Sequence, residues 1–334
     1  MKKILIIKIG AIGDVVMCLP LISEIKKTHP ESEITWLCGN QVRPLLERID
    51  GIDKLISVDE NRLLKGSFIS RISEILKVWA QLAFQKFNLA LYYYHSNLYK
   101  LLYLPAITQK TQGFGKQKNT GSSLPVPGRH HSLEYIQAFS GIKAGENFQP
   151  EYPFFRDLPK KDQIESTTKR VVFACGGAKN ILRNDDLRRW PISHYKRLGK
   201  LVLDQGWELI LTGAPSDSWV RDEFSGLAFT DLIGTLKLCG FVDFLASADV
   251  LVTHDSGPLH LADLAECPVL GLFGPTMPEE KKSLNKKSRY IWGGAHLACR
   301  PCYDGKEYAA CENNLCLKSV DPETVFAELQ NILK

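Results

Sequence analysis

The sequence lacks any run of eighteen apolar residues, so no segment is long enough to span a bilayer as a helix. A short-period repeat and a low-complexity segment are also absent, which excludes repeat architectures. The basic, apolar start imitates a secretion signal, but Lys8 and Asp14 interrupt it and no small-residue cleavage site follows. We therefore expect a cytoplasmic protein.

Strong charge of either sign is missing as well. The net charge is +5 over 334 residues, which fits acidic lipid head groups or a nucleotide as partner and gives no reason to expect nucleic acid. Hydrophobic residues make up 44% and charged residues 24%, the profile of a soluble globular protein. The nine cysteines are an odd number, and without export we expect reduced thiols.

The length predicts two domains, and short aliphatic strands alternate with helices in both halves. Strands are expected at 3–9, 34–38, 54–58 and 89–94, and again at 170–175, 208–212, 231–233, 250–253 and 269–273. This pattern predicts an α/β fold of two doubly wound, Rossmann-like domains facing across a cleft, at 1–160 and 161–320. A proline-bearing linker is expected at 145–169, and a final helix at 321–334 is expected to pack back on the amino-terminal domain.

The segment from Val250 to His260 carries the strongest local signal. A buried strand runs into Asp255, Ser256 and Gly257, and a proline suits the first turn of the helix that follows. The free amides at that helix start would hold a phosphate, to which His260 would donate. The alternative is that Asp255 and Ser256 cap the helix and His260 is a surface residue.

A second strand ends in Gly176 and Gly177, which leave room for a ligand. Downstream, Arg188 and Arg189 would neutralise a diphosphate leaving group. The alternative is a charged loop before a helix begun by Pro191, which we favour for Arg189 and not for Arg188.

The loop from Gly10 to Gly13 only loosely resembles a dinucleotide-binding fingerprint. The third glycine is missing and no acid ends the second strand at Cys38, so a nicotinamide-dependent oxidoreductase is disfavoured. Asp14 lies at a strand-to-helix turn, where a carboxylate is suited to act as a general base. From the residues alone we favour the alternative, a capping aspartate.

Four cysteines lie within eighteen residues, as Cys299-x2-Cys302-x8-Cys311-x4-Cys316. This grouping is compatible with a structural zinc site, with His296 as a substitute ligand. From the irregular spacing we favour the alternatives, reduced structural thiols or an adventitious disulfide.

The same segments, in order, carry a resemblance to a known family. They are Ile4-Leu-Ile-Ile-Lys-Ile-Gly-Ala-Ile-Gly-Asp14 with Leu19-Pro20, Arg188-Arg-Trp-Pro191, Gly213-Ala-Pro215, Asp255-Ser-Gly-Pro-Leu-His260 and Gly271-Leu-Phe-Gly-Pro-Thr276. Together they resemble glycosyltransferase family 9, the lipopolysaccharide heptosyltransferases, over essentially the whole chain. The resemblance implies a GT-B fold and inverting transfer of heptose from ADP-heptose to the lipopolysaccharide inner core, without a cofactor or catalytic metal.

Carried over by position, the resemblance implies a role for each matching residue. Asp14 would deprotonate the acceptor hydroxyl, and Arg188 would stand in for a lysine near the diphosphate. Asp217 would lie near the donor ribose and Asp255 near the sugar hydroxyls, while Ser256, Gly257 and His260 would contact the phosphates. Gly10, Ala11 and the Gly176-Gly177 pair replace hydroxyl residues of some members, which leaves donor and acceptor less defined than the fold.

The acceptor half offers only basic candidates for contacts with acidic core sugars. They are Arg62, Lys65, Lys100, Arg129, His130 and His131, for which a solvated basic surface is the alternative. The resemblance further implies a monomer working peripherally at the inner face of the cytoplasmic membrane. Another sugar nucleotide or acceptor, or a relative without turnover, are the remaining alternatives.

Overall fold

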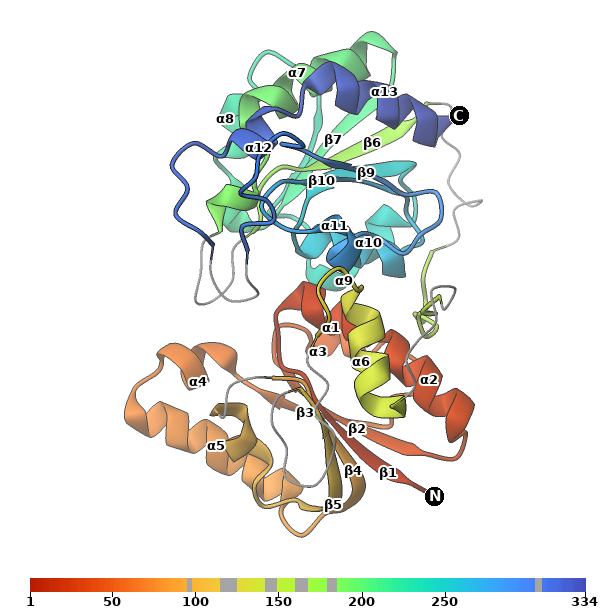
Figure 1. Ribbon diagram of the computed structural model, residues 1–334, viewed down its shortest axis with the longest axis vertical. Helices are drawn as coiled ribbons and strands as arrows, with labels where there is room; N and C mark the ends of the chain where they lie inside the picture. The colour runs from red at the N-terminus through yellow and green to blue at the C-terminus, as the bar shows by residue number, and fades with distance from the viewer. Residues whose placement is uncertain (95–97, 115–124, 142–148, 160–167, 179–184, 304–307) are drawn as a thin grey trace. The chain divides into compact units, whose positions relative to one another are not determined.

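The computed structural model describes residues 1–94, 98–114, 125–141, 149–159, 168–178, 185–303 and 308–334. They form two compact units, Met1–Asp157 and Leu158–Lys334, each built on a parallel sheet with helices (Figure 1). The division falls within 145–169, the expected linker, part of which lies outside the described residues. Among the described helices, none has the length and apolarity that a bilayer span requires.

The first unit has a five-stranded parallel sheet in the order β3-β2-β1-β4-β5. Its strands are β1 (Lys3–Ile7), β2 (Glu33–Gly39), β3 (Lys54–Val58), β4 (Lys86–Tyr92) and β5 (Ile107–Gly113). β1 lies in the middle, and four of its five residues are buried. An aliphatic strand of this kind fits a sheet covered on both faces.

The helices of this unit are α1 (Ile12–Cys18), α2 (Pro20–Thr28), α3 (Arg43–Leu46), α4 (Glu60–Lys65), α5 (Phe68–Leu82) and α6 (His131–Ser140), with the 3-10 helix η1 (Leu98–Tyr103). The amphipathic stretch after β1 is two helices, because Pro20 has no amide to continue the hydrogen-bond ladder and instead begins α2. α1 therefore ends at Cys18, close behind the turn that carries Asp14.

The second unit has a six-stranded parallel sheet in the order β11-β10-β9-β6-β7-β8. Its strands are β6 (Arg170–Ala174), β7 (Glu208–Gly213), β8 (Thr230–Ile233), β9 (Val250–His254), β10 (Val269–Phe273) and β11 (Arg289–Trp292). The chain winds outward from β6 and then, from β9, outward in the opposite direction. The β6–β9 pair is thus a topological switch point, as is β1–β4 in the first unit, and ligands of such sheets bind beyond the carboxyl ends of the strands there.

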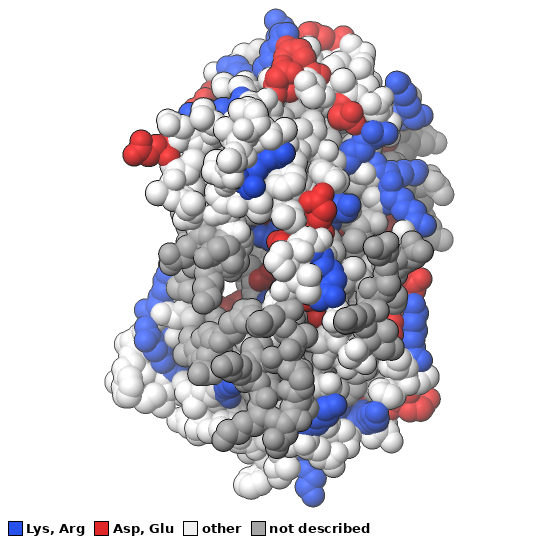
Figure 2. Space-filling view, viewed as in Figure 1, with Lys and Arg blue, Asp and Glu red and all other residues white. Residues whose placement is uncertain are grey.

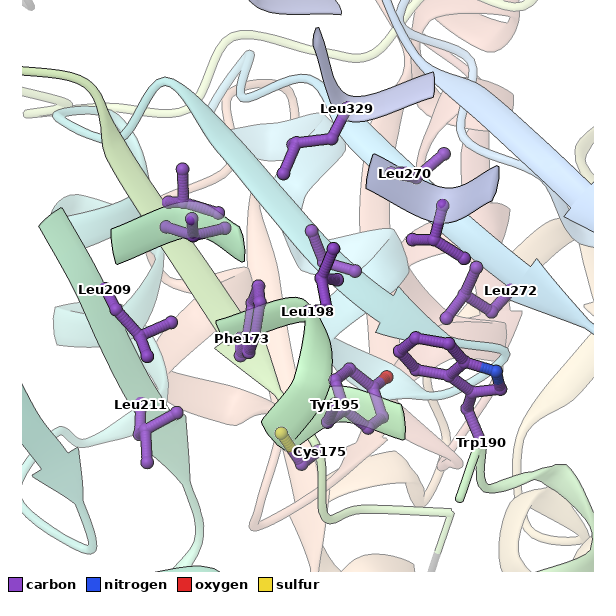
Figure 3. Packing of buried hydrophobic residues seen from close by; sticks show 14 of the residues in the cluster. Phe173, Cys175, Trp190, Tyr195, Leu198, Leu209, Leu211, Leu270, Leu272 and Leu329 are labelled. Carbon is purple, nitrogen blue, oxygen red and sulfur yellow. The ribbon is translucent and has the colours of Figure 1, made fainter. Parts of the chain in front are cut away.

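The helical segments of the second unit are α7 (Ile192–Asp204), α8 (Val220–Glu223), α9 (Leu238–Leu245), α10 (Gly257–Leu264), α11 (Pro278–Lys281), α12 (Leu315–Lys318) and α13 (Pro322–Leu333), with the 3-10 turns η3 (Asp186–Arg188) and η4 (Pro215–Asp217). α13 packs on α7, and its Val325 and Leu329 are fully buried with Leu198 in the core of this unit (Figure 3). The buried apolar face of α13 thus packs within its own unit, and the expected packing on the amino-terminal domain stays a prediction.

Candidate active-site residues

Four neighbouring strands of the second unit, β10, β9, β6 and β7, bring their following loops to one edge of the sheet. These loops hold the predicted donor-binding residues Gly176, Gly177, Asp217, Asp255 and Ser256. Parallel strands end at a common edge, so residues far apart in sequence become neighbours there.

Asp217 holds two of these loops together. Its Oδ1 accepts a hydrogen bond from the Gly177 amide at 3.3 Å, and its Oδ2 accepts one from the Ala214 amide at 2.8 Å. Gly176 is needed for this contact, because a Cβ there would lie 2.3 Å from Cγ of Asp217. Gly177 has φ +80°, a left-handed conformation that glycine adopts without strain. The buried Asp217 carboxylate therefore joins the loops that follow β6 and β7. Its contact with a donor ribose stays a prediction.

Arg189 does more than the charged-loop alternative allowed. Its Nε and Nη2 donate to the Gly177 carbonyl at 3.1 and 2.8 Å. Its Nη1 also pairs with Asp186. The guanidinium thus fixes the β6 loop, a role that the sequence offered no means to assign.

Asp255 is a buried carboxylate between two cations. Arg188 Nη1 and Lys281 Nζ each lie 3.6 Å from its Oδ2. Burial alone would raise the pKa of Asp255, but the charges of Lys281 and Arg188 lower it well below its usual range. Arg188 also donates to Asp185 Oδ2 at 2.9 Å. Lys281 was not predicted, because it reaches the site from a separate short helix, α11, that no motif marks.

The start of α10 faces the same edge. Ser256 is its N-cap residue, but the Ser256 hydroxyl donates to the His254 carbonyl at 3.2 Å and no described side chain caps the helix. The first amides of α10 therefore remain suited to an anion. His260 in the first turn is buried, which corrects the alternative of a surface residue, and its charged form would help to lower the pKa of Asp255.

Two buried polar atoms of this site are not fully satisfied, although two cations lie 3.6 Å from one of them. Among the described residues, Oδ2 of Asp255 and Nε of Arg188 have no hydrogen-bond partner. Such atoms are costly in a folded protein unless a ligand or solvent satisfies them. The pair offers an acceptor for a ligand hydroxyl and a donor for a ligand anion, which is the chemistry of a sugar diphosphate.

Two tyrosines complete the surroundings, and the sequence reasoning missed them. The rings of Tyr303 and Tyr308 lie 4.7 Å apart, and Lys281 Nζ is 4.7 Å from the Tyr303 ring centre. Burial raises the pKa of Tyr308, although the charge of Arg188 opposes this, so the hydroxyl stays protonated. The cysteine-bearing segment thus folds beside the Asp255 cluster.

The candidate zinc site is not formed. All four cysteines are described, yet the described residues contain no group of three or more His, Cys, Asp or Glu side chains able to hold a metal. Cys299, Cys311 and His296 are exposed, whereas Cys316 is buried and its Sγ donates to Asn314 Oδ1 at 3.4 Å. Besides burial, the neighbouring Cys311 and Cys299 raise the pKa of Cys302, and Cys302 and Cys311 raise that of Cys316, so the four residues lie near one another with different exposure. None of the nine cysteines is in a disulfide.

In the first unit, Asp14 lies in the first turn of α1, beyond the carboxyl end of β1. Its side chain is 39% exposed, and Lys8 Nζ lies 3.4 Å from its Oδ2 while being only 5% exposed. Ala11, and not Asp14, is the N-cap residue of α1, so the capping alternative is wrong. Lys8 was not predicted as a site residue, because the sequence marks it only as a charge within an apolar run.

Aromatic side chains surround Lys8 and hold the adjoining loop. Lys8 Nζ lies 4.7 Å from the ring centre of Tyr94 and 5.5 Å from that of Tyr135. The Tyr94 hydroxyl accepts from the amides of Ile9 and Gly10 at 2.6 and 3.1 Å. The turn before Asp14 is therefore fixed by Tyr94, which lies just after β4, the neighbour of β1 across the switch point.

The basic acceptor candidates do not form one cluster of available cations. Arg129 is engaged by the buried Glu134, with Nε–Oε1 at 2.5 Å and Nη2–Oε2 at 2.9 Å. His130 is buried, and its Nδ1 accepts from the Ser132 amide as the N-cap of α6. Both residues order the start of α6, where His131 is half-buried.

The candidates on the other side of the sheet are more open. Arg62 is half-exposed and pairs with the buried Glu74 at 3.1 Å, and Lys65 is exposed at the end of α4. Lys100 lies 5.7 Å from the ring centre of Tyr92. Lys65 and Lys100 remain available for an acidic partner, whereas one guanidinium nitrogen of Arg62 is already paired with Glu74.

Comparisons with known proteins agree with this architecture. One relative is lipooligosaccharide heptosyltransferase 2 of Haemophilus ducreyi, which is 26% identical over 87% of this chain and 90% of the relative. Another is lipopolysaccharide heptosyltransferase 1 of Pseudomonas aeruginosa, which is 22% identical over 99% of this chain and 98% of the relative. One similar structure is E. coli ADP-heptose LPS heptosyltransferase II, with a TM-score of 0.75 and 22% identity, covering 100% of this chain and 98% of that chain. Another is E. coli heptosyltransferase WaaC with ADP, with a TM-score of 0.77 and 18% identity, covering 99% of both chains. The predicted GT-B fold is confirmed. The model of glycosyltransferase family 9 (heptosyltransferase) matches residues 128–311, and the chain belongs to that family of glycosyltransferases.

Proposed function

We propose that this glycosyltransferase transfers heptose from ADP-heptose to the inner core of lipopolysaccharide, with inversion and without a catalytic metal. The observation that carries the proposal is the buried Asp255 between Arg188 and Lys281, beside the uncapped start of α10. The names of the relatives support heptose and a lipopolysaccharide acceptor, and the ADP bound by WaaC supports the nucleotide.

The proposed donor site assigns the sugar and the diphosphate to different groups. The diphosphate would accept hydrogen bonds from the first amides of α10 at Ser256 and Gly257, from His260 and from Arg188. Oδ2 of Asp255 would accept from a sugar hydroxyl, since it has no hydrogen-bond partner among the described residues. Each carboxylate oxygen of Asp217 keeps a second lone pair for the ribose.

The proposed reaction is a single displacement. Asp14 takes the proton of the acceptor hydroxyl while that oxygen forms a bond to the anomeric carbon of the donor. The bond from the anomeric carbon to the β-phosphate oxygen breaks, and ADP departs with the electron pair. Arg188 and the amides of α10 stabilise the charge that grows on the leaving oxygen. A single attack from the face opposite the leaving group inverts the configuration.

On the acceptor side, we assign Arg62, Lys65, Lys100 and His131 to contacts with acidic core sugars. Arg129 is assigned a supporting role, because Glu134 already engages its guanidinium. The reaction is placed at the inner face of the cytoplasmic membrane, where a lipid-anchored acceptor would be available.

Thermal-shift measurements against nucleotides and sugar nucleotides test the donor class. A ligand that binds only the folded protein raises its melting temperature, so ADP and ADP-heptose should stabilise the protein and UDP, GDP and NAD should not. The variant Arg188→Met should lose this stabilisation. A response to UDP or GDP alone would assign the site to another sugar nucleotide, and no response to any of them would reject the proposed donor site.

A further inference from the structure

Helix α5 carries two apolar stripes on different faces. One stripe, Val78 and Leu82, is fully buried against the sheet of the first unit. The other is open to solvent: Ile69 is 79% exposed, Ile72 39% and Leu76 53%. Their spacing of three and four residues puts them on one face of the helix. Single exposed aliphatic side chains are ordinary, but an aligned stripe of them indicates an interaction surface.

The exposed stripe continues onto neighbouring segments. The Trp79 indole donates to the Leu101 carbonyl at 2.8 Å and so fixes η1 against α5. Leu101 and, just after η1, Leu104 are exposed, as is Phe68 at the start of α5. We call the set Phe68, Ile69, Ile72, Leu76, Leu101 and Leu104 the α5 surface.

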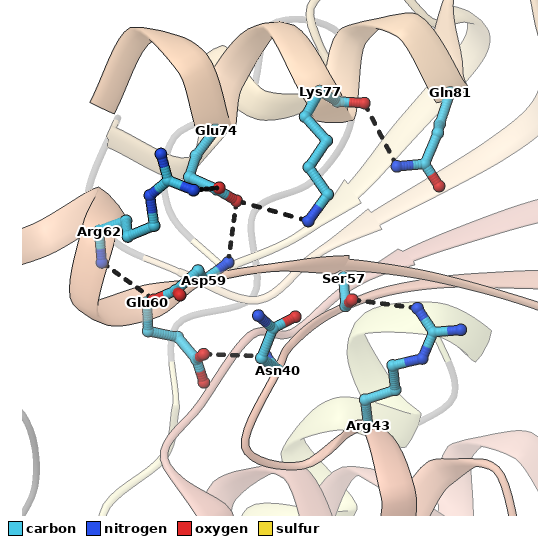
Figure 4. Close-up of polar contacts among 9 residues, drawn as sticks. All are labelled: Asn40, Arg43, Ser57, Asp59, Glu60, Arg62, Glu74, Lys77 and Gln81. Carbon is cyan, nitrogen blue, oxygen red and sulfur yellow. Dashed lines mark hydrogen bonds and ion pairs between the residues drawn. The ribbon is translucent and has the colours of Figure 1, made fainter. Parts of the chain in front are cut away.

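The charges around the α5 surface are positive. Residues 60–110 contain seven lysines and arginines but only two acidic residues, Glu60 and Glu74, and both of these are buried. Glu74 is held by Arg62 at 3.1 Å and Lys77 at 3.8 Å, and it accepts from the Asp59 amide at 3.2 Å (Figure 4). Asp59, just before this range, is half-buried and its carboxylate caps α4 through the Arg62 amide. The exposed charged side chains of residues 60–110 are therefore basic. Figure 2 shows the corresponding corner of the first unit as white with blue beside it.

We propose that the α5 surface docks this protein on the head-group region of an anionic lipid bilayer. The aliphatic and aromatic side chains would enter the boundary between head groups and acyl chains, and Arg71 and Lys77 would contact lipid phosphates. A second copy of the chain fits less well, because it would bring the same positive charge to the contact and no exposed acid to meet it.

Flotation of the full chain with vesicles tests the proposal. Binding to vesicles of phosphatidylcholine mixed with phosphatidylglycerol should exceed binding to phosphatidylcholine alone by about tenfold, and added salt should weaken it. The triple variant I69S/I72S/L76S should bind at least about tenfold more weakly, because it removes the apolar part of the contact. Phe154→Ser, an exposed apolar residue outside the α5 surface, is the matched control and should bind like the wild type.

Two further measurements separate this proposal from its rivals. The melting temperature and the turnover of the triple variant with a short water-soluble acceptor should match the wild type, since the buried stripe of α5 is untouched. Absence of turnover in both proteins would count against the proposed reaction and not against docking. Equal vesicle binding by wild type and triple variant overturns docking. So does a wild-type dimer in sedimentation velocity that the triple variant dissolves, because the surface would then join two copies.

Discussion

The ammonium group of Lys8 lies 3.4 Å from Oδ2 of Asp14. The lysine side chain is buried, whereas the side chain of Asp14 is 39% exposed. Burial alone would lower the pKa of Lys8, but the Asp14 carboxylate and the Tyr135 hydroxyl raise it, so the lysine stays charged. Asp14 thus has a buried cation on one side while its own side chain stays 39% exposed, an arrangement that suits the base proposed above.

Replacing Asp14 by asparagine should abolish turnover and also lower the melting temperature. Without the carboxylate, the buried Lys8 loses its counter-charge, a cost of about 1 kcal/mol given the partial exposure of the pair. The double variant D14N/K8M should recover the melting temperature but not the turnover. Both would be measured by thermal shift and a transfer assay, with ADP binding unchanged.

The matched control for that pair is Glu47→Gln, which removes an acid from the exposed ion pair with Arg43. It should change neither quantity measurably. Turnover in D14N/K8M near the wild-type value would remove Asp14 from the role of base, whatever the melting temperatures show.

Replacing Lys281 by methionine should weaken ADP binding by about tenfold. With Lys281 gone, Asp255 depends more on the charge of Arg188, so less of that charge is available to a diphosphate. Isothermal titration with ADP measures the change. Lys287→Met, an exposed lysine shortly after α11, is the control and should bind ADP normally. Equal affinities in the two variants would show that Lys281 has no part in the site.

Replacing Gly176 by alanine should destabilise the second unit by about 1–3 kcal/mol. The new Cβ would lie 2.3 Å from Cγ of Asp217, which must then leave the amides of Gly177 and Ala214. Gly240→Ala is the control, because that position in α9 has nothing within 4 Å of a new Cβ. Alanine there should stabilise the protein by about 0.5–1 kcal/mol. Urea unfolding compares them, and a neutral Gly176→Ala would contradict the packing described.

The order of strands and helices could be predicted because each buried strand is a short aliphatic run in the sequence. β9 is an uninterrupted buried run, and Pro322 marks the start of α13, so both were predicted within a residue or two. β5 (Ile107–Gly113) was missed because it is a polar edge strand, with Gln109 and Lys110 exposed. Edge strands bury too little to carry the aliphatic pattern on which such predictions rest.

The site was readable only where a motif marks it. The loops at Gly176 and Asp255 were found because strand, glycine and helix start follow one another in the chain. The lysines that pair with the site carboxylates have no such motif. Lys8 lies beside Asp14, and Lys281 beside Asp255, only once the chain is folded. The cysteine spacing likewise does not fix the surroundings of each thiol, because Cys316 is buried while Cys299 and Cys311 are exposed.

Removing metal should leave stability unchanged. Because the described cysteines form no metal-binding group, dialysis against a chelator should not shift the melting temperature. A structural zinc ion would instead contribute folding free energy that chelation abolishes. Alkylation of the native protein should modify Cys299 and Cys311 before Cys316, as mass spectrometry of peptides would show. A melting temperature lowered by the chelator and restored by zinc would contradict this reading of the cluster.

Stability of the second unit should fall as the pH falls below about 6.5, and His254 should be the cause. Burial, with the charges of Arg188 and Arg189, lowers the pKa of His254 to about 3. Between these two values the unfolded chain binds a proton that the native protein does not, so unfolding becomes easier by about 1.4 kcal/mol per pH unit. Asp255 adds to the loss only below about pH 4, where its carboxyl begins to protonate in the unfolded chain while its lowered pKa keeps it ionised in the native protein. Urea unfolding at several pH values measures the slope, which should flatten in His254→Gln and persist in the exposed control His296→Gln. An unchanged slope in His254→Gln would show that His254 is not the group responsible.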